Sequence, residues 1–381
     1  MDFNLTSEHL EDLAHYRAFG NSEIAPLFHT MEEIGETPAE LLKKMRDAQL
    51  LGIPMPVEYG GLGKDYISAT LCMEELSKIC PAVSGIINVT TEIVSFALEQ
   101  FGTPEQKAKY LTPLAKGDVI GAFALTEPGA GSDAAGVRTT AVLEGNHWVL
   151  NGTKCFITNA EISAIFLIAA MTDIGEGKKK ISMFIVEKDF PGFHIGKHED
   201  KMGIRASSTC ELILENCIVP KENLLGALGK GLKIALGGLD GGRVMVAAQG
   251  LGIAQGCWDE AVDYLKTHVV ETDGAINHQA VQFKLAELQI EIDAARLMVY
   301  RAAAQWSEGV PFGKAAAMAK YYAADIANDV ARACIQLMGH AGSTYGTRVE
   351  QFFRDAKITE IYEGTNEIQL MVVAGQLGLK A

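Results

Sequence analysis

The segment IYEGTNEIQL, residues 361 to 370, places a carboxylate, Glu363, between Tyr362 and Gly364. A glycine inside a helix costs about 1 kcal/mol relative to alanine, so helix propensity alone does not account for this segment. An acidic side chain beside a residue that helices avoid raises the question of what holds the segment in place, and for what chemistry.

Common cofactor and metal motifs do not explain the rest of the chain. The richest glycine segment, AFALTEPGAGSDAAG at residues 122 to 136, lacks the G-x-G-x-x-G spacing of a dinucleotide-binding fold. Lys314 is followed by Ala315, so the hydroxyl that a P-loop needs for magnesium is missing. The nine histidines show no metal-binding spacing, and we interpret His198 and Glu199 as solvated surface. The sequence therefore predicts no Rossmann fold, no nucleotide hydrolysis and no metal site.

Composition and charge indicate a globular chain without a nucleic-acid partner. With 381 residues and 48% hydrophobic content, the chain can form two or three domains with sizeable cores. Its 33 basic and 48 acidic side chains give a formal net charge of −15, and the longest basic run is residues 178 to 180. Such a surface does not favour a phosphate backbone.

Cysteine usage and hydropathy predict a cytoplasmic protein with no membrane partner. The seven cysteines are odd in number and never in C-x-x-C spacing, which argues against a disulfide framework and favours a reducing compartment. The start, MDFNLTSEHLEDLAHY, carries four acids and no signal or transit pattern. The most apolar run, Ile162 to Met171, is too short to span a bilayer.

The period of the hydrophobic pattern changes twice along the chain. Residues 1 to 120 follow a helical period and contain two expected capping boxes with proline at the first helical position, at residues 37 to 40 and 103 to 106. Residues 121 to 230 follow a period of two, with strand-like runs such as AIFLIAA and ISMFIVE and a turn predicted at Asn151-Gly152. A helical domain followed by a β domain is therefore predicted.

Residues 231 to 381 return to the helical period in long segments. In one of them apolar side chains step by three or four residues, at Val281, Leu285, Leu288, Ile292, Ala295 and Val299. Such a stripe on a long helix is typical of a bundle, so the order helical, β, helical bundle is predicted.

Five segments carry the remaining signal: LTEPGAGSD at 125 to 133, KCFITNA at 154 to 160, LDGGR at 239 to 243, QLMGHAG at 336 to 342 and RDAKITEIYEGTNEIQ at 354 to 369. In this order and at these intervals they resemble the acyl-CoA dehydrogenase family of flavoenzymes over nearly the whole chain, nearest to its short-chain, butyryl-CoA-type members.

This resemblance implies a fold, a cofactor and a reaction. The fold is a multidomain α+β chain with an N-terminal all-α domain, a central β-barrel-like domain and a C-terminal four-helix bundle, assembled as a homotetramer. FAD is bound between the β domain and the bundle, and its adenine arm reaches a neighbouring subunit. The Cα–Cβ bond of a short or compact acyl-CoA is oxidised to the enoyl-CoA, and an electron-transferring flavoprotein accepts the electrons. Alternatives are an enoyl-CoA reductase on the same scaffold, or a half-site subunit of a hetero-oligomer.

The resemblance also implies roles for single residues. Glu363 is the base that removes the Cα proton, its backbone N–H donates to the thioester oxygen, and Gly364 lets the chain approach the substrate closely. Asp240 and Arg243 form the pair expected at the pantetheine and the active site. The implied cofactor residues are Phe123, Leu125, Thr126, Ser132, Phe156, Thr158, Gln279, Gln336, Gly339, Thr365 and Glu367, and Ser132 also reaches the acyl-CoA region.

One departure concerns the FAD pyrophosphate. Family members usually carry an R-x-x-F-G segment whose arginine binds it, and the corresponding positions here hold His268, Glu271 and Thr272. His340 also replaces a frequent glycine. Because a bidentate arginine is a strong charge-assisted contact to phosphate, we expect the phosphate end of FAD to be held more weakly.

The acyl tail is implied to lie against IINVTTEIVSFALEQFG, residues 86 to 102. Its bulky Ile86, Ile93 and Phe96 favour a short or compact acyl group. Glu92 could be a second acid that reaches the acyl chain, but we interpret it as a solvated helix position.

Overall fold

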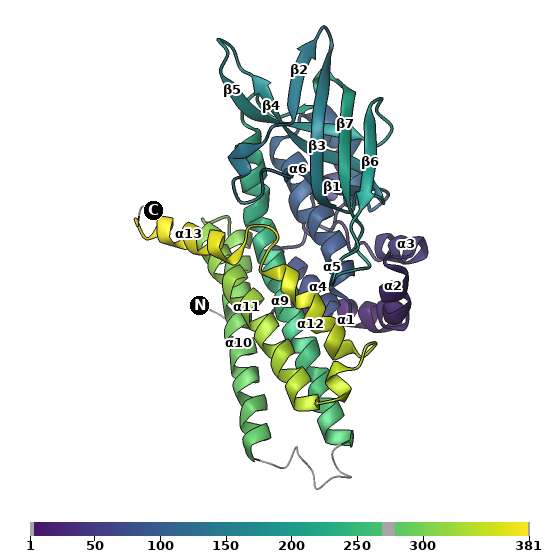
Figure 1. Cartoon of the computed structure of the whole chain (residues 1–381), viewed down its shortest axis with the longest axis vertical. Coiled ribbons are helices and arrows are strands. Elements are labelled where there is room, and N and C mark those ends of the chain that lie inside the picture. Colours follow the sequence, from purple (N-terminus) through teal and green to yellow (C-terminus); the bar gives the residue numbers. More distant parts are fainter. Residues whose placement is uncertain (1–3, 269–278, 380–381) are drawn as a thin grey trace.

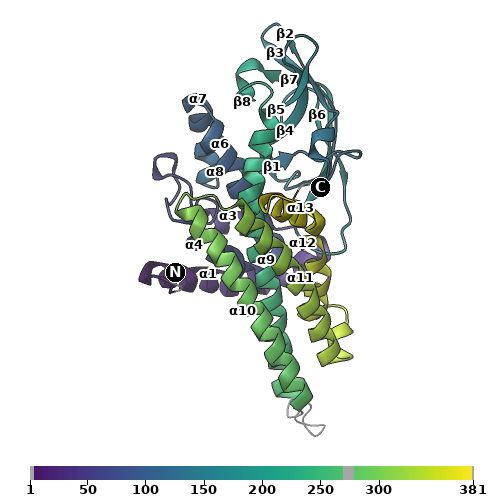
Figure 2. The same ribbon diagram turned by 90° about the vertical axis from the view of Figure 1, so that its left-hand side faces the viewer.

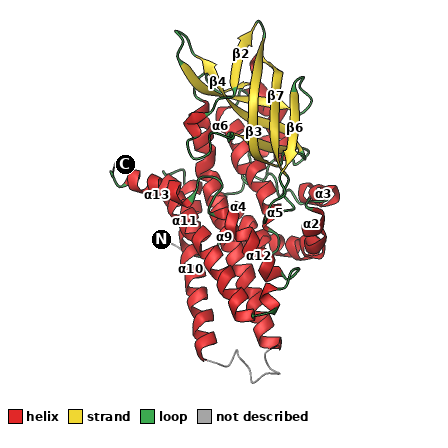
Figure 3. Ribbon diagram, viewed as in Figure 1, coloured by secondary structure: helices red, strands yellow, loops and turns green. Residues whose placement is uncertain are grey.

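The computed structural model describes residues 4–268 and 279–379, with only the backbone of His268. A β domain lies at one end and a long helix bundle at the other, and the N-terminal helices pack beside both (Figure 1). Figure 3 shows the same division by element type, with the strands gathered at one end. The predicted order, helical, then β, then a helical bundle, is confirmed.

The N-terminal part consists of short helices. They are α1 (Ser7–Phe19), η1 (Gly20–Ile24), η2 (Ala25–Leu27), α2 (Phe28–Ile34), α3 (Ala39–Asp47), η3 (Val57–Tyr59), α4 (Tyr66–Ser77), α5 (Pro81–Ile87), η4 (Asn88–Ser95), α6 (Phe96–Phe101), α7 (Pro104–Gln106), η5 (Lys107–Leu111) and α8 (Thr112–Ala115).

One stretch of this part is long and apolar enough, by length and composition, to cross a bilayer. It is Pro81–Phe101, which runs through α5, η4 and α6. Because 83% of its most apolar window is buried inside the protein, it has the character of a core helix. The run from Ile162 to Met171, named above as the most apolar, lies mostly in a strand.

The β domain contains a mixed eight-stranded sheet. Its strands are β1 (Ile120–Ala124), β2 (Thr140–Glu144), β3 (His147–Thr158), β4 (Ser163–Asp173), β5 (Lys179–Glu187), β6 (Phe193–His198), β7 (Thr209–Pro220) and β8 (Leu224–Leu225), with short helices η6 (Ala134–Gly136) and η7 (Lys221–Asn223). The strand order is β6-β7-β3-β2-β4-β5-β8, and β1 pairs with β4 in parallel. The predicted runs AIFLIAA and ISMFIVE are β4 and β5.

The two halves of the sheet enclose a common core, which gives the domain its barrel-like form. Trp148 on β3 packs edge-on against Phe184 on β5, and Phe166 on β4 packs against Phe193 on β6, with ring centroids 5.2 and 4.6 Å apart. β6 and β8 are the two ends of the strand order, so the sheet bends around its core without closing.

The C-terminal part is built on three long helices. Its elements are α9 (Gly231–His268), α10 (Gln279–Ser307), α11 (Gly313–Met338), η10 (Ala341–Ser343), α12 (Arg348–Thr359) and α13 (Asn366–Gln376). In both views α9 runs from beneath the sheet through the bundle (Figures 1 and 2). The predicted stripe on α10 is buried from Leu285 to Val299, while Val281 at its start is half-buried. The largest core joins this bundle to the N-terminal helices.

Of the two predicted capping boxes one is confirmed and one is wrong. Thr103 accepts from the backbone N–H of Gln106 while the Gln106 side chain accepts from the N–H of Thr103, the reciprocal pair expected. Thr37 instead donates its hydroxyl hydrogen bond to the carbonyl of Ala206 at 2.9 Å, and α3 begins without a side-chain cap. The hydroxyl that was predicted to cap the helix therefore forms a tertiary hydrogen bond to the β domain.

The turn predicted at Asn151-Gly152 is also wrong. Both residues pair within β3, and the chain turns at Gly145 (φ 61°) between β2 and β3. Gly152 is required for a different reason, because a Cβ there would lie 2.4 Å from Oγ1 of Thr139.

Candidate active site

Glu363 lies in the short connection between α12 and α13, in a backbone conformation that side chains rarely adopt. Its φ is +53°, and Gly364 follows with φ +95°. The hydroxyl of Thr365 then caps α13 by accepting from the N–H of Ile368 at 3.4 Å. A left-handed residue carries strain that its surroundings must stabilise.

Buried side chains hold the carbonyls of this connection. Lys320 on α11, which is fully buried, donates to the carbonyl of Gly364 at 2.8 Å, and Gln369 donates to the same oxygen at 2.8 Å. A Cβ at Gly364 would lie 2.7 Å from Nε2 of Gln369. Positive φ and this crowding answer why a glycine follows the carboxylate. The expected role of Gly364 in substrate contact stays a prediction.

The Glu363 carboxylate is seated between η4 and α9. Asn88 on η4 donates from Nδ2 to Oε1 of Glu363 at 2.6 Å. Among the described residues, Oε2 of Glu363 is buried and has no hydrogen-bond partner. Gly242 on α9 makes room for this oxygen, since a Cβ there would lie 2.1 Å from it. One carboxylate oxygen is therefore positioned by the protein and the other is left free for a ligand.

The electrostatic setting suits a general base. Burial raises the pKa of Glu363 from 4.5 to about 7, and the hydrogen bond from Asn88 and the charges of Lys320 and Arg243 oppose this rise. Burial likewise lowers the pKa of Lys320 from 10.5 to about 8. A carboxylate with a pKa near neutral pH exists in both protonation states under working conditions, as proton transfer requires.

Asp240 and Arg243, the predicted substrate pair, lie one turn apart on α9 and contact each other. Nη1 of Arg243 donates to Oδ1 of Asp240 at 2.6 Å, and its Nε donates to the carbonyl of Glu363 at 3.5 Å. Arg243 is buried, and Asp240 is half-buried. The structure thus brings Glu363, Gly364, Asp240 and Arg243 together.

The predicted flavin residues of the β domain cluster on neighbouring segments. Phe123 and Leu125 lie on or just after β1, Phe156 and Thr158 lie on β3, and the carbonyl of Thr126 accepts from the N–H of Cys155 on β3 at 3.1 Å. An ion pair that the sequence interpretation missed fixes this arrangement. Nζ of the buried Lys154 donates to Glu127 at 2.7 Å and to the carbonyl of Leu125 at 3.0 Å.

The exposure and backbone conformation of Phe156 indicate whether these residues could hold a flavin ring. Its side chain is 64% exposed, and its φ is +56° on an otherwise extended strand. An exposed aromatic ring held by a strained backbone is costly in water and favourable against the flat face of a bound ring. Thr126 and Thr158, which are half-buried residues on neighbouring segments, carry hydroxyl donors. The residues present are compatible with a flavin ring.

The remaining predicted cofactor residues do not all lie near this cluster. Lys320, which contacts Gly364, and Gln336 are 16 residues apart on α11 (336 minus 320), or about 24 Å at 1.5 Å per residue. Gly339 follows Gln336, and Gln279 begins α10, so these three residues lie at the end of the bundle far from the sheet (Figure 1).

The other predicted cofactor residues lie at exposed or half-buried positions. Ser132 and Glu367 are exposed, and Thr365 is half-buried at the start of α13. Glu271 and Thr272, at the positions of the usual R-x-x-F-G segment, lie outside the described residues, as does the side chain of His268.

The interpretation of Glu92 as a solvated helix position is wrong. Its side chain is 1% exposed, and burial raises its pKa from 4.5 to about 8. The flanking apolar residues of the segment gave a signal of burial, but an isolated acid is so rarely buried that solvation was the better expectation from sequence. Sequence reasoning also missed Asn88, Gly242 and Lys320, which position Glu363 from three separate elements.

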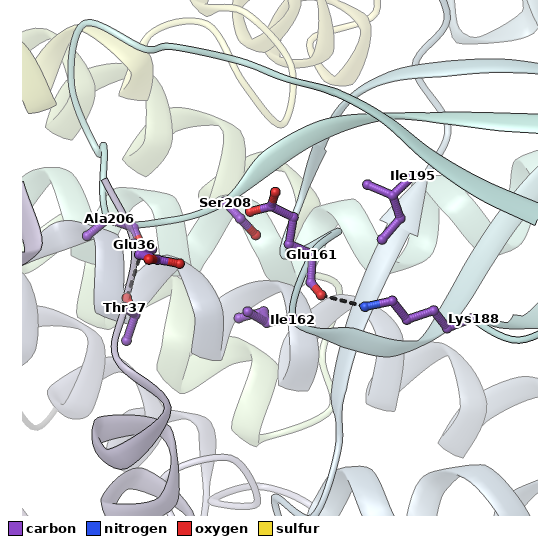
Figure 4. Close-up of a pocket in the computed structure, with 8 residues that line it drawn as sticks. All are labelled: Glu36, Thr37, Glu161, Ile162, Lys188, Ile195, Ala206 and Ser208. Atoms are coloured by element: carbon purple, nitrogen blue, oxygen red, sulfur yellow. Dashed lines mark hydrogen bonds between the residues drawn. The ribbon is translucent and has the colours of Figure 1, made fainter. Parts of the chain in front are cut away.

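A cavity away from Glu363 is drawn in Figure 4. It has a volume of about 470 Å³, and its walls include Glu161, Lys188 and Ser208, none of which is a predicted site residue. Glu161, His198 and Cys210 each have one atom that could bind a metal ion, and these three atoms lie within 4.8 Å of one another. Nδ1 of His198 is 3.1 Å from Oε2 of Glu161. The expectation of no metal site stays a prediction.

The sequence as a whole matches known proteins closely. Family models for the N-terminal, middle and C-terminal domains of acyl-CoA dehydrogenase match residues 6–118, 122–217 and 229–378. The short-chain specific acyl-CoA dehydrogenase of Clostridium acetobutylicum is 47% identical over 99% of this chain and 100% of that protein. The mitochondrial short-chain specific acyl-CoA dehydrogenase of Homo sapiens is 43% identical over 95% of this chain and 88% of that protein.

Solved structures agree with these sequence matches. Butyryl-CoA dehydrogenase from Megasphaera elsdenii superimposes with a TM-score of 0.96 at 43% identity, covering 99% of this chain and 100% of that chain. A chain from a study of the electron transferring flavoprotein of Acidaminococcus fermentans gives 0.96 at 44% identity, with 99% of each chain covered. An acyl-CoA dehydrogenase complexed with FAD from Bacillus anthracis gives 0.92 at 32% identity over 98% of this chain and 67% of that chain. The chain belongs to the acyl-CoA dehydrogenase family of FAD-dependent oxidoreductases.

Proposed function

We propose that this protein oxidises the Cα–Cβ bond of a short or compact acyl-CoA thioester and that Glu363 is the base for the Cα proton. The observation that carries the proposal is the buried Oε2 of Glu363, which has no partner among the described residues while Oε1 is held by Asn88. An oxygen left free in a buried setting, on a group with a pKa near 7, is suited to accept a proton from carbon.

The reaction separates one proton and one hydride from neighbouring carbons. The Cα proton passes to Oε2 of Glu363, and the enoyl-CoA forms as the hydride leaves Cβ. Bound FAD supplies the hydride acceptor, with Phe156, Thr126 and Thr158 as the residues that would hold its ring. Negative charge that develops on the thioester oxygen needs donors, and the backbone N–H of Glu363, which bonds no acceptor within the described residues, is available for this role.

The surroundings of η4 support a short or compact acyl group. Ile93 is buried against α9, within 3.6 Å of the Cβ position of Gly238, and Phe96 packs edge-on against Trp306. Bulky side chains that already fill the space leave little room for additional methylenes. We therefore propose that butyryl-CoA is a better substrate than long linear thioesters.

Anaerobic mixing of the purified, FAD-loaded protein with acyl-CoA thioesters tests the proposal, with bleaching of the oxidised flavin as the readout. We expect butyryl-CoA to bleach the flavin faster than palmitoyl-CoA, and Glu363→Gln to bind FAD and thioester without bleaching. Near wild-type bleaching by Glu363→Gln contradicts the assignment of the base, and faster bleaching by palmitoyl-CoA contradicts the assigned substrate class.

We also propose a homotetramer, in which a second copy supplies the cofactor residues at the far end of the bundle. Phe283, Ile290 and Leu297 are 60%, 66% and 53% exposed and recur every seven residues on α10, a spacing that suits packing against another helix. Light scattering after gel filtration tests the assembly, and a monomer that retains FAD and activity would contradict it.

An electron-transferring flavoprotein is the proposed electron acceptor. Support comes from the similar chain in the Acidaminococcus fermentans study. Reduction of a purified electron-transferring flavoprotein by substrate-reduced protein tests the electron acceptor.

A cytoplasmic location is proposed because all seven cysteines are buried and unpaired.

A further inference from the structure

Glu92 is a buried titratable group that the proposed reaction does not use. It lies on η4, is 1% exposed, and its Oε2 has no hydrogen-bond partner among the described residues. Buried polar atoms in folded proteins are nearly always hydrogen-bonded. An apolar side chain would fill the same space without leaving an oxygen unpaired, so the carboxyl group requires an explanation beyond packing.

The position of Glu92 places it beside the proposed acyl pocket. Asn88, which holds the Glu363 carboxylate, precedes it by four residues, so the two side chains leave neighbouring positions on one face of the helix. The next residue, Ile93, reaches within 3.5 Å of the Cβ position of Gly242, the glycine that makes room for Glu363. Glu92 is therefore about one helical turn from Asn88, the residue that holds the Glu363 carboxylate.

Two further neighbours of Glu92 are on α4, and no ion pair joins Glu92 to a cation within the described residues. Burial raises the pKa of Tyr66 and of Cys72, and the nearby Glu92 carboxylate raises each further. The ring of Tyr66 stacks on Trp306 with centroids 3.6 Å apart, and Trp306 lies against Gly241 on α9. Tyr66 and Cys72 thus bring no positive charge to Glu92, and burial alone raises the pKa of Glu92 to about 8.

A neutral carboxyl group can donate one hydrogen bond and accept others. We propose that Glu92 is a specificity-determining residue, whose carboxyl group hydrogen-bonds an oxygen carried by the acyl chain beyond Cβ. The substrate class that this selects is a short acyl-CoA with a hydroxyl or carbonyl group on its tail. This inference rests on the proposed function, because it uses the acyl pocket of that reaction.

Matched pairs of thioesters test the inference with FAD-loaded protein. The pairs are 4-hydroxybutyryl-CoA with butyryl-CoA, and 5-hydroxypentanoyl-CoA with pentanoyl-CoA, and kcat/KM for flavin reduction is measured for each. We expect the wild type to favour the hydroxyacyl member of at least one pair by about 10- to 100-fold, since a site built to hydrogen-bond a substrate hydroxyl discriminates against analogues without it.

Two variants separate hydrogen bonding from packing. Glu92→Leu removes the hydrogen bond at similar volume and is expected to abolish or reverse the preference, whereas Glu92→Gln keeps a donor and an acceptor and is expected to retain most of it. Glu92→Met replaces the leucine variant if that variant does not hold FAD.

The possible outcomes are distinct. A hydroxyacyl-to-acyl ratio that is the same in the wild type and in the apolar variant overturns the inference, as does a wild-type preference for the unsubstituted member of both pairs. If no thioester reduces the flavin, butyryl-CoA included, the proposed function fails first and this inference fails with it.

Discussion

Gly242 on α9 offers the sharpest test of the site, because its missing side chain makes room for the Glu363 carboxylate. A Cβ at position 242 would lie 2.1 Å from Oε2 of Glu363, whereas ordinary contact begins at 3.4 Å. Gly242→Ala therefore displaces this oxygen by roughly 1.3 Å (3.4 minus 2.1) and disturbs the hydrogen bond from Asn88. A misplacement of about 1 Å costs on the order of 10²-fold in rate, which corresponds to about 2.7 kcal/mol.

The same substitution should leave the fold intact, which makes the loss of rate interpretable. The clash is with the end of a flexible side chain, and alanine inside a helix is favoured over glycine by about 1 kcal/mol. Gly237→Ala on the same helix is the matched control, because its Cβ would meet nothing within 4 Å. Stopped-flow flavin reduction by butyryl-CoA, FAD content and Tm are measured for both variants. A Gly242→Ala protein with full FAD content and a wild-type reduction rate would refute the placement of the base.

Four further perturbations test the base, its neighbours and the cofactor. Glu363→Gln should lower flavin reduction by about 10²- to 10⁴-fold, while wild-type kcat/KM should rise with pH through about 7 as the carboxylate forms; a flat wild-type profile would contradict this. Lys320→Met removes a charge that lowers the pKa of Glu363, so the midpoint of that profile should move to higher pH. Burial raises the pKa of Glu92 from 4.5 to about 8, so the folded protein keeps this proton at pH values where the unfolded chain has lost it. The free energy of unfolding therefore falls as pH rises from about 4.5 to 8, and Glu92→Gln should raise Tm at pH 8.5 but not at pH 5. His268→Arg should tighten FAD binding by roughly 10- to 100-fold in a titration of apoprotein. Equal Kd values would show either that this chain holds the phosphates in another way or that position 268 does not face the cofactor.

The fold could be predicted from sequence because its main signals are periodic and repeated. The period of two across residues 139 to 157 became β2 and β3, and the stripe that ends at Val299 became the buried face of α10. Each of these signals is a sum over many side chains that face one core, so no single residue decides it. The spacing of three residues places Asp240 and Arg243 on one face of α9, where they contact each other, and their expected role toward the substrate stays a prediction.

The errors came from positions where one distant contact outweighs local preference. Thr37 is a good capping residue by type, but the carbonyl of Ala206, 169 residues away in sequence, takes its hydroxyl. The Asn151-Gly152 pair favours a turn by residue type. The glycine is instead required because Thr139 on the adjoining segment approaches position 152 closely. An acid such as Glu92 is expected from sequence to be solvated, but the fold buries it. Such outcomes depend on which segments meet in space, and that information is not local.

The cations around Glu363 explain how its pKa stays near neutral although two positive side chains lie close by. Within the described residues no ion pair joins Arg243 or Lys320 to the Glu363 carboxylate. Arg243 directs its guanidinium at Asp240, 2.6 Å away, and Lys320 directs its ammonium at the carbonyl of Gly364, 2.8 Å away. A direct salt bridge would hold the pKa of the carboxylate low and weaken it as a base. Because Asp240 and the Gly364 carbonyl engage the charges instead, burial remains the larger influence, and the carboxylate keeps both its position and its basicity.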